Sequence, residues 1–241
     1  MGCPSDRLSW CGRGGPRTAD RQHRREARPV QGAGARNLGG RTGPAHRRYD
    51  PPMPAFDHVL LNTERLQLRP LRADDAPALF AIFSDPRVAR YLSRPAWTSI
   101  DQAHVRIGQD ADAMAAGTLL RLGLERRADR ALVGECLFFN LVPTCRRAEM
   151  GYALAHAAWG AGLMHEALVA LIELGFAQLE LNRIEADIDP RNGASASTLE
   201  RLGFRREGLL RERWIVQGEV SDSALYGLLA ADWAATRPPS A

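Results

Sequence analysis

The chain has 241 residues, of which 45% are hydrophobic and 25% are charged, and these proportions are ordinary for a soluble globular protein. No apolar run approaches the roughly 18 residues of a membrane-spanning helix, and the first thirty residues lack the apolar segment of a secretory signal. The four cysteines show no Cys-x-x-Cys spacing, which argues against a zinc site or a disulfide framework, so we expect a cytoplasmic protein. All 32 basic residues are arginines, which excludes enzymes that need a Schiff-base lysine.

The net charge of +4 is distributed unevenly along the chain. Residues 1–52 carry 11 arginines and 4 acidic residues, whereas the remainder is slightly acidic. The first segment is rich in Gly, Arg and Pro and shows no periodicity, so it cannot bury enough apolar surface to offset the entropy of ordering. We therefore expect a disordered extension over 1–52, a folded domain over 53–236 and a short tail over 237–241. A basic arm that binds RNA is the alternative for 1–52, although the acidic remainder argues against nucleic acid as a partner.

Hydrophobic periodicity and turn residues predict a mixture of strands and helices from Arg65 onward. We expect Pro86 to break the first helix and Gly117 to end the second. Several consecutive strands mixed with helices argue for one α/β (α+β) domain rather than a bundle or a sandwich. The predicted elements are a strand from residue 65, helices over 74–83 and 99–116, strands over 119–125, 132–139 and 147–154, a helix after 162, a strand over 183–189, a helix over 194–202, and strands over 204–211 and 224–229.

A glycine-containing turn over 158–163 opens one of the predicted helices. Glycines ahead of a helix N-terminus let backbone N–H groups close around an anion, and the helix dipole favours negative charge there. About twenty residues after that turn, the strand that contains Ile184 and Ile188 meets a Pro-Arg-Asn turn and then a helix that stops at Gly203. This succession suggests a phosphate-bearing cofactor that lies beside a splayed sheet.

Three segments, 148–154, 159–168 and 182–210, together resemble the GCN5-related N-acetyltransferases (GNAT), and more narrowly the branch of the ribosomal-protein N-terminal acetyltransferases. The resemblance extends from Thr63 to Trp233. It implies a single GNAT-like domain whose mixed, mostly antiparallel sheet splays at the coenzyme A site and is flanked by helices. It also implies acetyl-CoA as co-substrate, a protein N-terminal or small-molecule amine as acceptor, no metal, and a monomer or homodimer.

The family signature Gln/Arg-x-x-Gly-x-Gly/Ala, whose backbone amides hold the coenzyme A pyrophosphate, falls on the glycine turn. Gly160 and Gly162 match it, whereas Ala157 and Ala161 stand where relatives often carry polar or basic residues. Amide donation survives these changes, but a side-chain phosphate contact is lost, and a plain glycine-rich turn is the alternative interpretation. The resemblance assigns cofactor contacts to Tyr152, Leu154, Trp159, Gly160, Ala161, Gly162, Leu163 and Asn192, with Tyr152 and Leu154 acting through their backbone.

Two residues are candidates for catalysis. Glu149 matches a glutamate that acts as general base in the branch, because an amine must lose a proton before it attacks a thioester; an ordinary salt bridge with Arg146 or Arg147 is the alternative. Ser195 matches a serine that is proposed to support the departing thiolate. Many relatives carry a tyrosine four residues later, and here that position is Leu199, so the usual phenolic acid is absent.

Other matched residues receive weaker interpretations. Asn192 matches an asparagine that binds the pantetheine arm or a water molecule, and it can also cap the following helix. Glu166 is expected to be structural at the start of its helix, Asp222 matches an acidic residue of the last hairpin without a clear role, and His165 has no second ligand at metal spacing. A non-catalytic coenzyme A-binding module is the main alternative to an enzyme.

Overall fold

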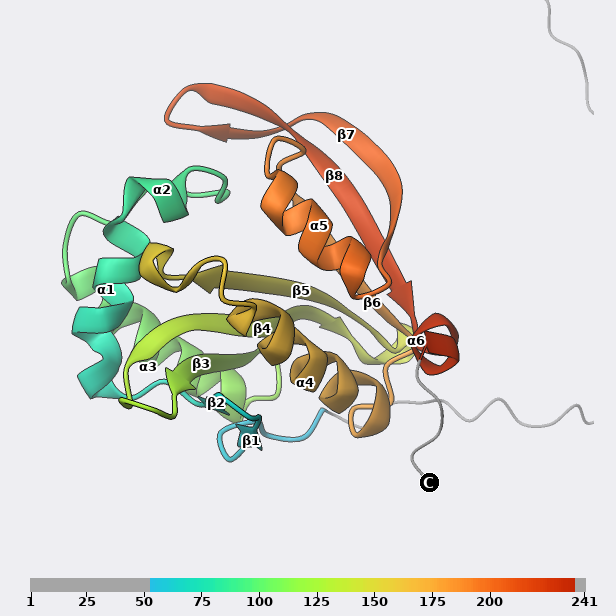
Figure 1. The fold of residues 1–241 in the computed structure, drawn as a ribbon, viewed down its shortest axis with the longest axis horizontal. Coiled ribbons are helices and arrows are strands. Elements are labelled where there is room, and N and C mark those ends of the chain that lie inside the picture. Colours follow the sequence, from blue (N-terminus) through green and yellow to red (C-terminus); the bar gives the residue numbers. More distant parts are fainter. Residues whose placement is uncertain (1–52, 237–241) are drawn as a thin grey trace, which may run out of the picture. The chain divides into compact units, whose positions relative to one another are not determined.

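An eight-stranded mixed sheet organises residues 53–236, the part of the chain that the computed structural model describes (Figure 1). The strands lie in the order β1-β2-β3-β4-β5-β6-β8-β7, and every neighbouring pair is antiparallel except β5 and β6. The expectations for 1–52 and 237–241 lie outside the described residues. The strands are β1 (Leu61–Asn62), β2 (Leu66–Arg69), β3 (Leu120–Arg126), β4 (Leu132–Val142), β5 (Arg147–Leu154), β6 (Arg183–Ile188), β7 (Arg205–Val216) and β8 (Glu219–Leu229).

Helices cover both faces of this sheet (Figure 1). One apolar cluster joins α4 to the leucines of β2 and β3, and a second cluster joins α1 and α3 to Ala153 of β5. Because side chains alternate between the faces of a strand, Met150 belongs to the first cluster and Ala153 to the second. The helices are α1 (Ala76–Ser84), α2 (Pro86–Ala89), α3 (Asp101–Ala115), α4 (Leu163–Ala177), α5 (Gly193–Arg201) and α6 (Ala230–Thr236), with 3-10 turns η1 (Ala73–Asp75), η2 (Pro143–Cys145) and η3 (His156–Ala158).

The two parallel strands β5 and β6 pair over only three positions, from Arg147 with Arg183 to Glu149 with Glu185. Beyond these positions β5 continues along β4 as far as Leu154, and β6 continues along β8 as far as Ile188. The strands therefore separate, and neither finds another strand for the edge that faces the gap. This geometry is the opening that the resemblance implied for the sheet.

The final hairpin is longer than the sequence pattern predicted. The predicted strands 204–211 and 224–229 are the inner parts of β7 and β8, which continue to a two-residue turn at Gln217 and Gly218. Both turn residues have positive φ angles, 50° and 85°, as two-residue hairpin turns require. The outer half was missed because β7 is exposed at almost every position and so lacks the alternation of a half-buried strand.

Pro86 does not simply end the first helix. The Asp85 side chain accepts a hydrogen bond from the Arg87 amide at 2.9 Å and so caps a second short helix, α2. Pro86 occupies the first position of that helix, where its missing N–H would have no helical partner in any case. The break thus redirects the chain into α2, which later proves to be part of a cavity wall.

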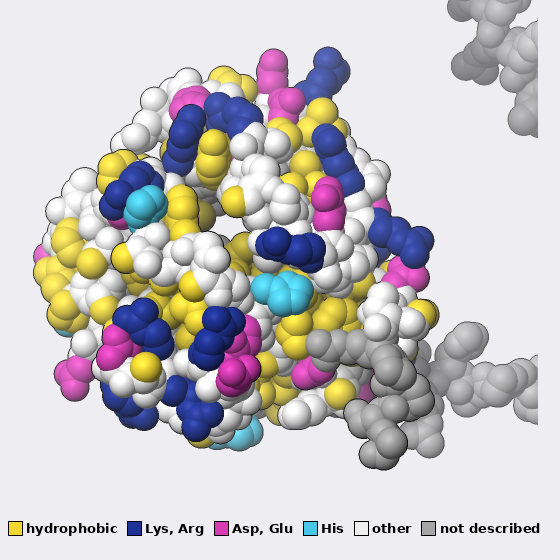
Figure 2. Space-filling view, in the orientation of Figure 1, with side chains coloured by type: hydrophobic (Ala, Val, Ile, Leu, Met, Phe, Trp, Pro, Cys, Tyr) yellow, Lys and Arg dark blue, Asp and Glu magenta, His cyan; other side chains and the backbone are white. Residues whose placement is uncertain are grey.

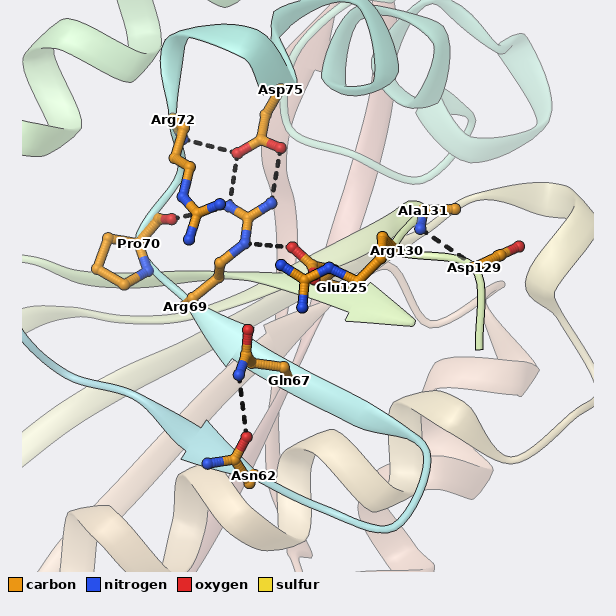
Figure 3. A network of polar contacts seen from close by, with 10 residues as sticks. All are labelled: Asn62, Gln67, Arg69, Pro70, Arg72, Asp75, Glu125, Asp129, Arg130 and Ala131. Atoms are coloured by element: carbon orange, nitrogen blue, oxygen red, sulfur yellow. Dashed lines mark hydrogen bonds and ion pairs between the residues drawn. The ribbon is translucent and has the colours of Figure 1, made fainter. Parts of the chain in front are cut away.

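A buried ion network ties β2 to η1 and β3 (Figure 3). The Arg69 side chain donates two hydrogen bonds to Asp75, at 2.7 and 2.9 Å, and one to Glu125 at 2.6 Å. Arg130 pairs with the second oxygen of Glu125 at 2.6 Å, from a side chain that is 65% exposed. Burial raises the pKa of Asp75, but its hydrogen bonds from Arg69 and the Arg72 amide outweigh burial and hold it below its ordinary value. Asp75 therefore stays charged inside the fold, and Arg69 holds both carboxylates in place.

We predict that Arg69→Met will destabilise the protein by roughly 3–5 kcal/mol, because it leaves two buried carboxylates without their shared partner. Arg130→Gln is the matched control and should cost less than about 1 kcal/mol, because an exposed ion pair contributes little. Urea unfolding followed by circular dichroism measures both. Similar losses for the two variants would contradict the assignment of Arg69 as the centre of the network.

Candidate functional site

A cavity of about 660 Å³ opens where β5 and β6 separate, and Figure 2 shows this face of the molecule hollowed near its centre. Its walls come from the sheet, the first turn of α5, the segment from α1 to residue 96, and the β7–β8 hairpin. Four predicted site residues line it: Glu149, Tyr152, Asn192 and Ser195. The glycine turn and Leu154 are not among the lining residues, so the structure separates the candidate catalytic groups from the candidate anion site.

The glycine turn has the backbone that the sequence predicted. Gly160 and Gly162 have φ angles of 75° and 73°, in the left-handed region that glycine adopts without strain. The turn leads directly into α4, and the Glu166 amide is the one that donates back to the Gly162 carbonyl, at 3.2 Å. The backbone amides that precede Glu166 in this turn have no acceptor within the helix, as is usual at a helix N-terminus. A side chain at Gly160 would meet no atom within 4 Å, so the turn is open to a ligand.

Arg65 reaches this turn from the other end of the chain, and sequence reasoning missed it. Its guanidinium donates to the Ala161 carbonyl at 2.8 Å and pairs with Glu166 at 2.6 Å. Another nitrogen of the Arg65 guanidinium, Nη2, lies 3.7 Å from the position that a Cβ atom would have at Gly162. A cation thus stands beside the turn although Ala157 and Ala161 provide none. No local pattern could reveal it, because about a hundred residues separate the partners.

Glu166 is structural, as its position suggested. It accepts hydrogen bonds from the Thr63 hydroxyl at 2.5 Å and from the Arg65 amide at 2.8 Å, in addition to the Arg65 side chain. Burial raises the pKa of Glu166, but these hydrogen bonds outweigh burial and keep it below its ordinary value. The carboxylate therefore anchors the start of α4 to the segment between β1 and β2.

Glu149 presents an uncompensated carboxylate to the cavity. It is half-buried at the last position where β5 pairs with β6. The two arginines that could have neutralised it are engaged elsewhere: Arg147 pairs with Glu185, and Arg146 donates to the Glu180 carbonyl at 2.6 Å. Within residues 53–236 no hydrogen bond or ion pair to the Glu149 carboxylate is found. Its oxygens are therefore open to a ligand in the cavity.

Ser195 has an unexpected partner in the side chain of Tyr152. The two hydroxyl oxygens lie 2.6 Å apart, and Ser195 is only 9% exposed. Burial raises the pKa of Tyr152 to about 12 despite the hydrogen bond with Ser195, so the phenol keeps its proton at neutral pH. The Tyr152 hydroxyl also lies 3.4 Å from the Ser195 carbonyl. When Tyr152 donates to Ser195 Oγ, the Ser195 hydroxyl proton remains for another acceptor. Leu199 is fully buried, but β5 supplies a phenol that the sequence had assigned only a backbone role.

The remaining candidates hold the site together. Asn192 accepts a hydrogen bond from the Ser195 amide at 3.1 Å, so it caps α5 and fixes Ser195 in the first turn. The Trp159 indole donates to the Leu154 carbonyl at 2.8 Å and links the end of β5 to the glycine turn. Asp222 accepts from the Glu212 amide at 2.9 Å, at a bulge of the hairpin where Glu212 has a φ of 52°.

Residues 53–236 contain neither a candidate metal site nor a candidate membrane span. No group of three or more His, Cys, Asp and Glu side chains there is arranged to hold a metal ion. Nor does that part of the chain contain a helix of the length and apolar character needed to cross a membrane.

Comparisons with known proteins agree with this architecture. A protein-family model described as an acetyltransferase (GNAT) domain matches residues 65–205. The chain is 36% identical over 174 residues to the "uncharacterized N-acetyltransferase p20" of Bacillus licheniformis, across 72% of this chain and 98% of that protein. It is 29% identical over 184 residues to the ribosomal protein uS5-alanine N-acetyltransferase of Escherichia coli strain K12, across 73% and 93%.

Among solved structures, the ribosomal-protein-S5-alanine acetyltransferase of Vibrio fischeri has a TM-score of 0.65 at 24% identity, over 75% of this chain and 100% of that one. At that identity the likeness supports the fold alone. The family model, in contrast, covers more than half of the chain, and the p20 relative is matched along nearly its whole length. The chain therefore belongs to the GNAT family of acetyltransferases, resembles within it the ribosomal-protein acetyltransferases, and is an N-acetyltransferase.

Proposed function

We propose that this enzyme transfers the acetyl group of acetyl-CoA directly to a primary amine, within a ternary complex held in the cavity between β5 and β6. The amine is a protein N-terminus or a small molecule. The observation that carries the proposal is the meeting in one cavity of a free carboxylate, Glu149, and a hydroxyl pair, Tyr152 and Ser195. A carboxylate can accept the proton of the amine, and a hydroxyl can support the leaving sulfur.

The donor fits along the unpaired edge of β5. We assign the pyrophosphate to the amides of residues 160–163, beside the Arg65 guanidinium, which compensates for the missing basic residues of the signature. From there the unpaired edge of β5 at Tyr152 leads toward Ser195 in the cavity, with Trp159 and Asn192 flanking this course. Acetyl-CoA supplies an activated thioester; the protein supplies its position and the proton transfers.

Glu149 is the proposed general base. An α-ammonium group has a reference pKa of about 7.7–8.0, so it must lose a proton near neutral pH before it can attack. The free carboxylate takes that proton directly or through a water molecule, and this role is open to it because Arg146 and Arg147 are otherwise engaged. As the bond from nitrogen to the acetyl carbon forms, the bond from that carbon to sulfur breaks.

Ser195 and Tyr152 are the proposed support for the departing sulfur. One hydroxyl proton is not used in the hydrogen bond between Tyr152 and Ser195. That proton can be donated to the sulfur as its negative charge develops. A thiol with a reference pKa near about 8.5 leaves largely as thiolate, so hydrogen bonding suffices at this step. No cysteine is among the described residues that line the cavity, which favours direct transfer over an acetylated enzyme.

The donor site can be tested by Gly162→Asp, which places a strained backbone and a negative charge where phosphates approach. We expect coenzyme A affinity, measured by calorimetry, to fall more than tenfold, about 1.4 kcal/mol. Arg65→Gln should also weaken binding. Gly108→Asp adds the same side chain at an open, exposed position of α3 and should leave affinity unchanged; equal affinities for all three variants would move the donor site elsewhere.

Glu149→Gln should lower turnover by roughly 10²–10⁴-fold if Glu149 is the base. The loss should shrink as the pH rises toward the pKa of the amine itself, because more of the amine is then already neutral. Glu219→Gln is the control, since this carboxylate also lines the cavity but is paired with Arg191. A Glu149→Gln enzyme with the full pH–rate profile of the parent, or parallel-line initial-velocity kinetics, would contradict the mechanism.

Ser195→Ala should cost on the order of 1–3 kcal/mol in transition-state stabilisation, the value of one hydrogen bond to a charged group. Tyr152→Phe should cost less, because Tyr152 acts through Ser195. The double variant should lose less than the sum of the two single losses, since both remove the same hydrogen-bonded unit. Strictly additive losses in kcat/KM would show that the two hydroxyls act independently.

A further inference from the structure

Arg94 is the exception in a cluster of charges whose other members are paired. Arg106 and Arg121 each contact both Glu135 and Asp110, so two guanidinium groups neutralise two carboxylates. Arg94 adds a third positive charge to the same surroundings, and within residues 53–236 no hydrogen bond or ion pair to its guanidinium is found. The cluster thus carries one positive charge in excess.

Stacking holds this extra guanidinium in place. The Arg94 guanidinium carbon lies 4.6 Å from the centre of the Phe83 ring and 5.8 Å from that of Trp97. Those rings are themselves buried and packed 4.9 Å apart, and Arg106 lies over the same pair. Arg94 is half-buried, and burial lowers the pKa of its guanidinium. An oriented, partly desolvated cation without a partner favours a carboxylate ligand, which its planar fork of donors matches.

Arg94 and Glu149 line the same cavity. Strand β4 lies between the strands that carry Glu149 and Arg121. Glu149 of β5 pairs with Phe139 of β4, and Arg121 of β3 pairs with Leu137, two residues away on β4. Two strand spacings and two residues of rise place the Cα atoms of Glu149 and Arg121 about 12 Å apart. Arg94 lies close enough to Arg121 for their charges to interact, so the cavity wall carries an unpaired cation near Arg121 as well as the Glu149 carboxylate.

We propose that the acceptor is a primary amine that also bears a carboxylate, which binds Arg94 while the amine lies near Glu149. This inference rests on the proposed function and adds the chemical class of the acceptor. A small amino acid and a peptide N-terminus with an acidic side chain nearby both have this chemistry.

The test compares acceptors that differ only in charge. Ala-Glu-Ala-amide and Ala-Ala-Glu-amide are each paired with the peptide that has Gln in place of Glu, and alanine is paired with alaninamide. For at least one pair we expect kcat/KM to be more than tenfold higher for the carboxylate, and the pair that responds distinguishes a peptide from a small molecule. Arg94→Gln should abolish that preference, so that the two members of each pair react with similar kcat/KM.

Arg87→Gln is the matched control, because Arg87 is exposed on α2, is paired with Asp85 and does not line the cavity. It should keep the preference. Thermal shifts with coenzyme A bound give a second readout that needs no turnover: the carboxylate partner should stabilise the parent and not the Arg94→Gln variant. Acetylation with no carboxylate preference, or a preference that survives Arg94→Gln, would overturn this inference alone; absence of transfer to any amine, with carboxylate-dependent thermal shifts intact, would count against the proposed function alone.

Discussion

The early separation of β5 from β6 is the constraint on which the rest of the molecule depends. Each strand is held by its other neighbour, β5 by β4 and β6 by β8, so the two cannot close over one another after Glu149. Backbone groups at a buried edge need partners, and a ligand chain that runs along that edge can provide them. The cavity, the position of Glu149 and the approach of α5 all follow from this one break in pairing.

The charged side chains discussed above are of two kinds: closed sets, in which every charge has a protein partner, and open groups, which have none among the described residues. Arg69 with Asp75 and Glu125, and Arg65 with Glu166, are closed sets in which every charge has a partner, and they fix strands and turns. Glu149 and Arg94 are open groups on the cavity wall. An unpaired charge that is partly removed from water is unfavourable for stability, so its presence there points to a ligand. Arginine and the acidic residues thus stabilise the fold where the protein supplies their partners, and can bind a ligand where it does not.

Sequence reasoning succeeded where local physics decides the outcome. The glycine turn could be predicted because left-handed backbone demands glycine, and β3, β4 and α4 have strong apolar patterns. It failed where distant segments meet: the contact of Arg65 with Ala161, and that of Tyr152 with Ser195, span about a hundred and about forty residues. The outer hairpin was missed for a third reason, because an exposed edge strand such as β7 carries no burial signal.

The hairpin has a consequence for substrate tolerance. Apart from its pairing within the sheet, its outer part is attached by ion pairs with exposed arginines, such as Arg213 with Asp187 and Arg191 with Glu219. Such pairs contribute little energy, so this wall can shift at small cost to the hydrophobic core. The glycine turn, in contrast, is anchored by the hydrogen bonds of Glu166. For the proposed transfer, this difference predicts strict recognition of the donor and tolerance of bulk in the acceptor.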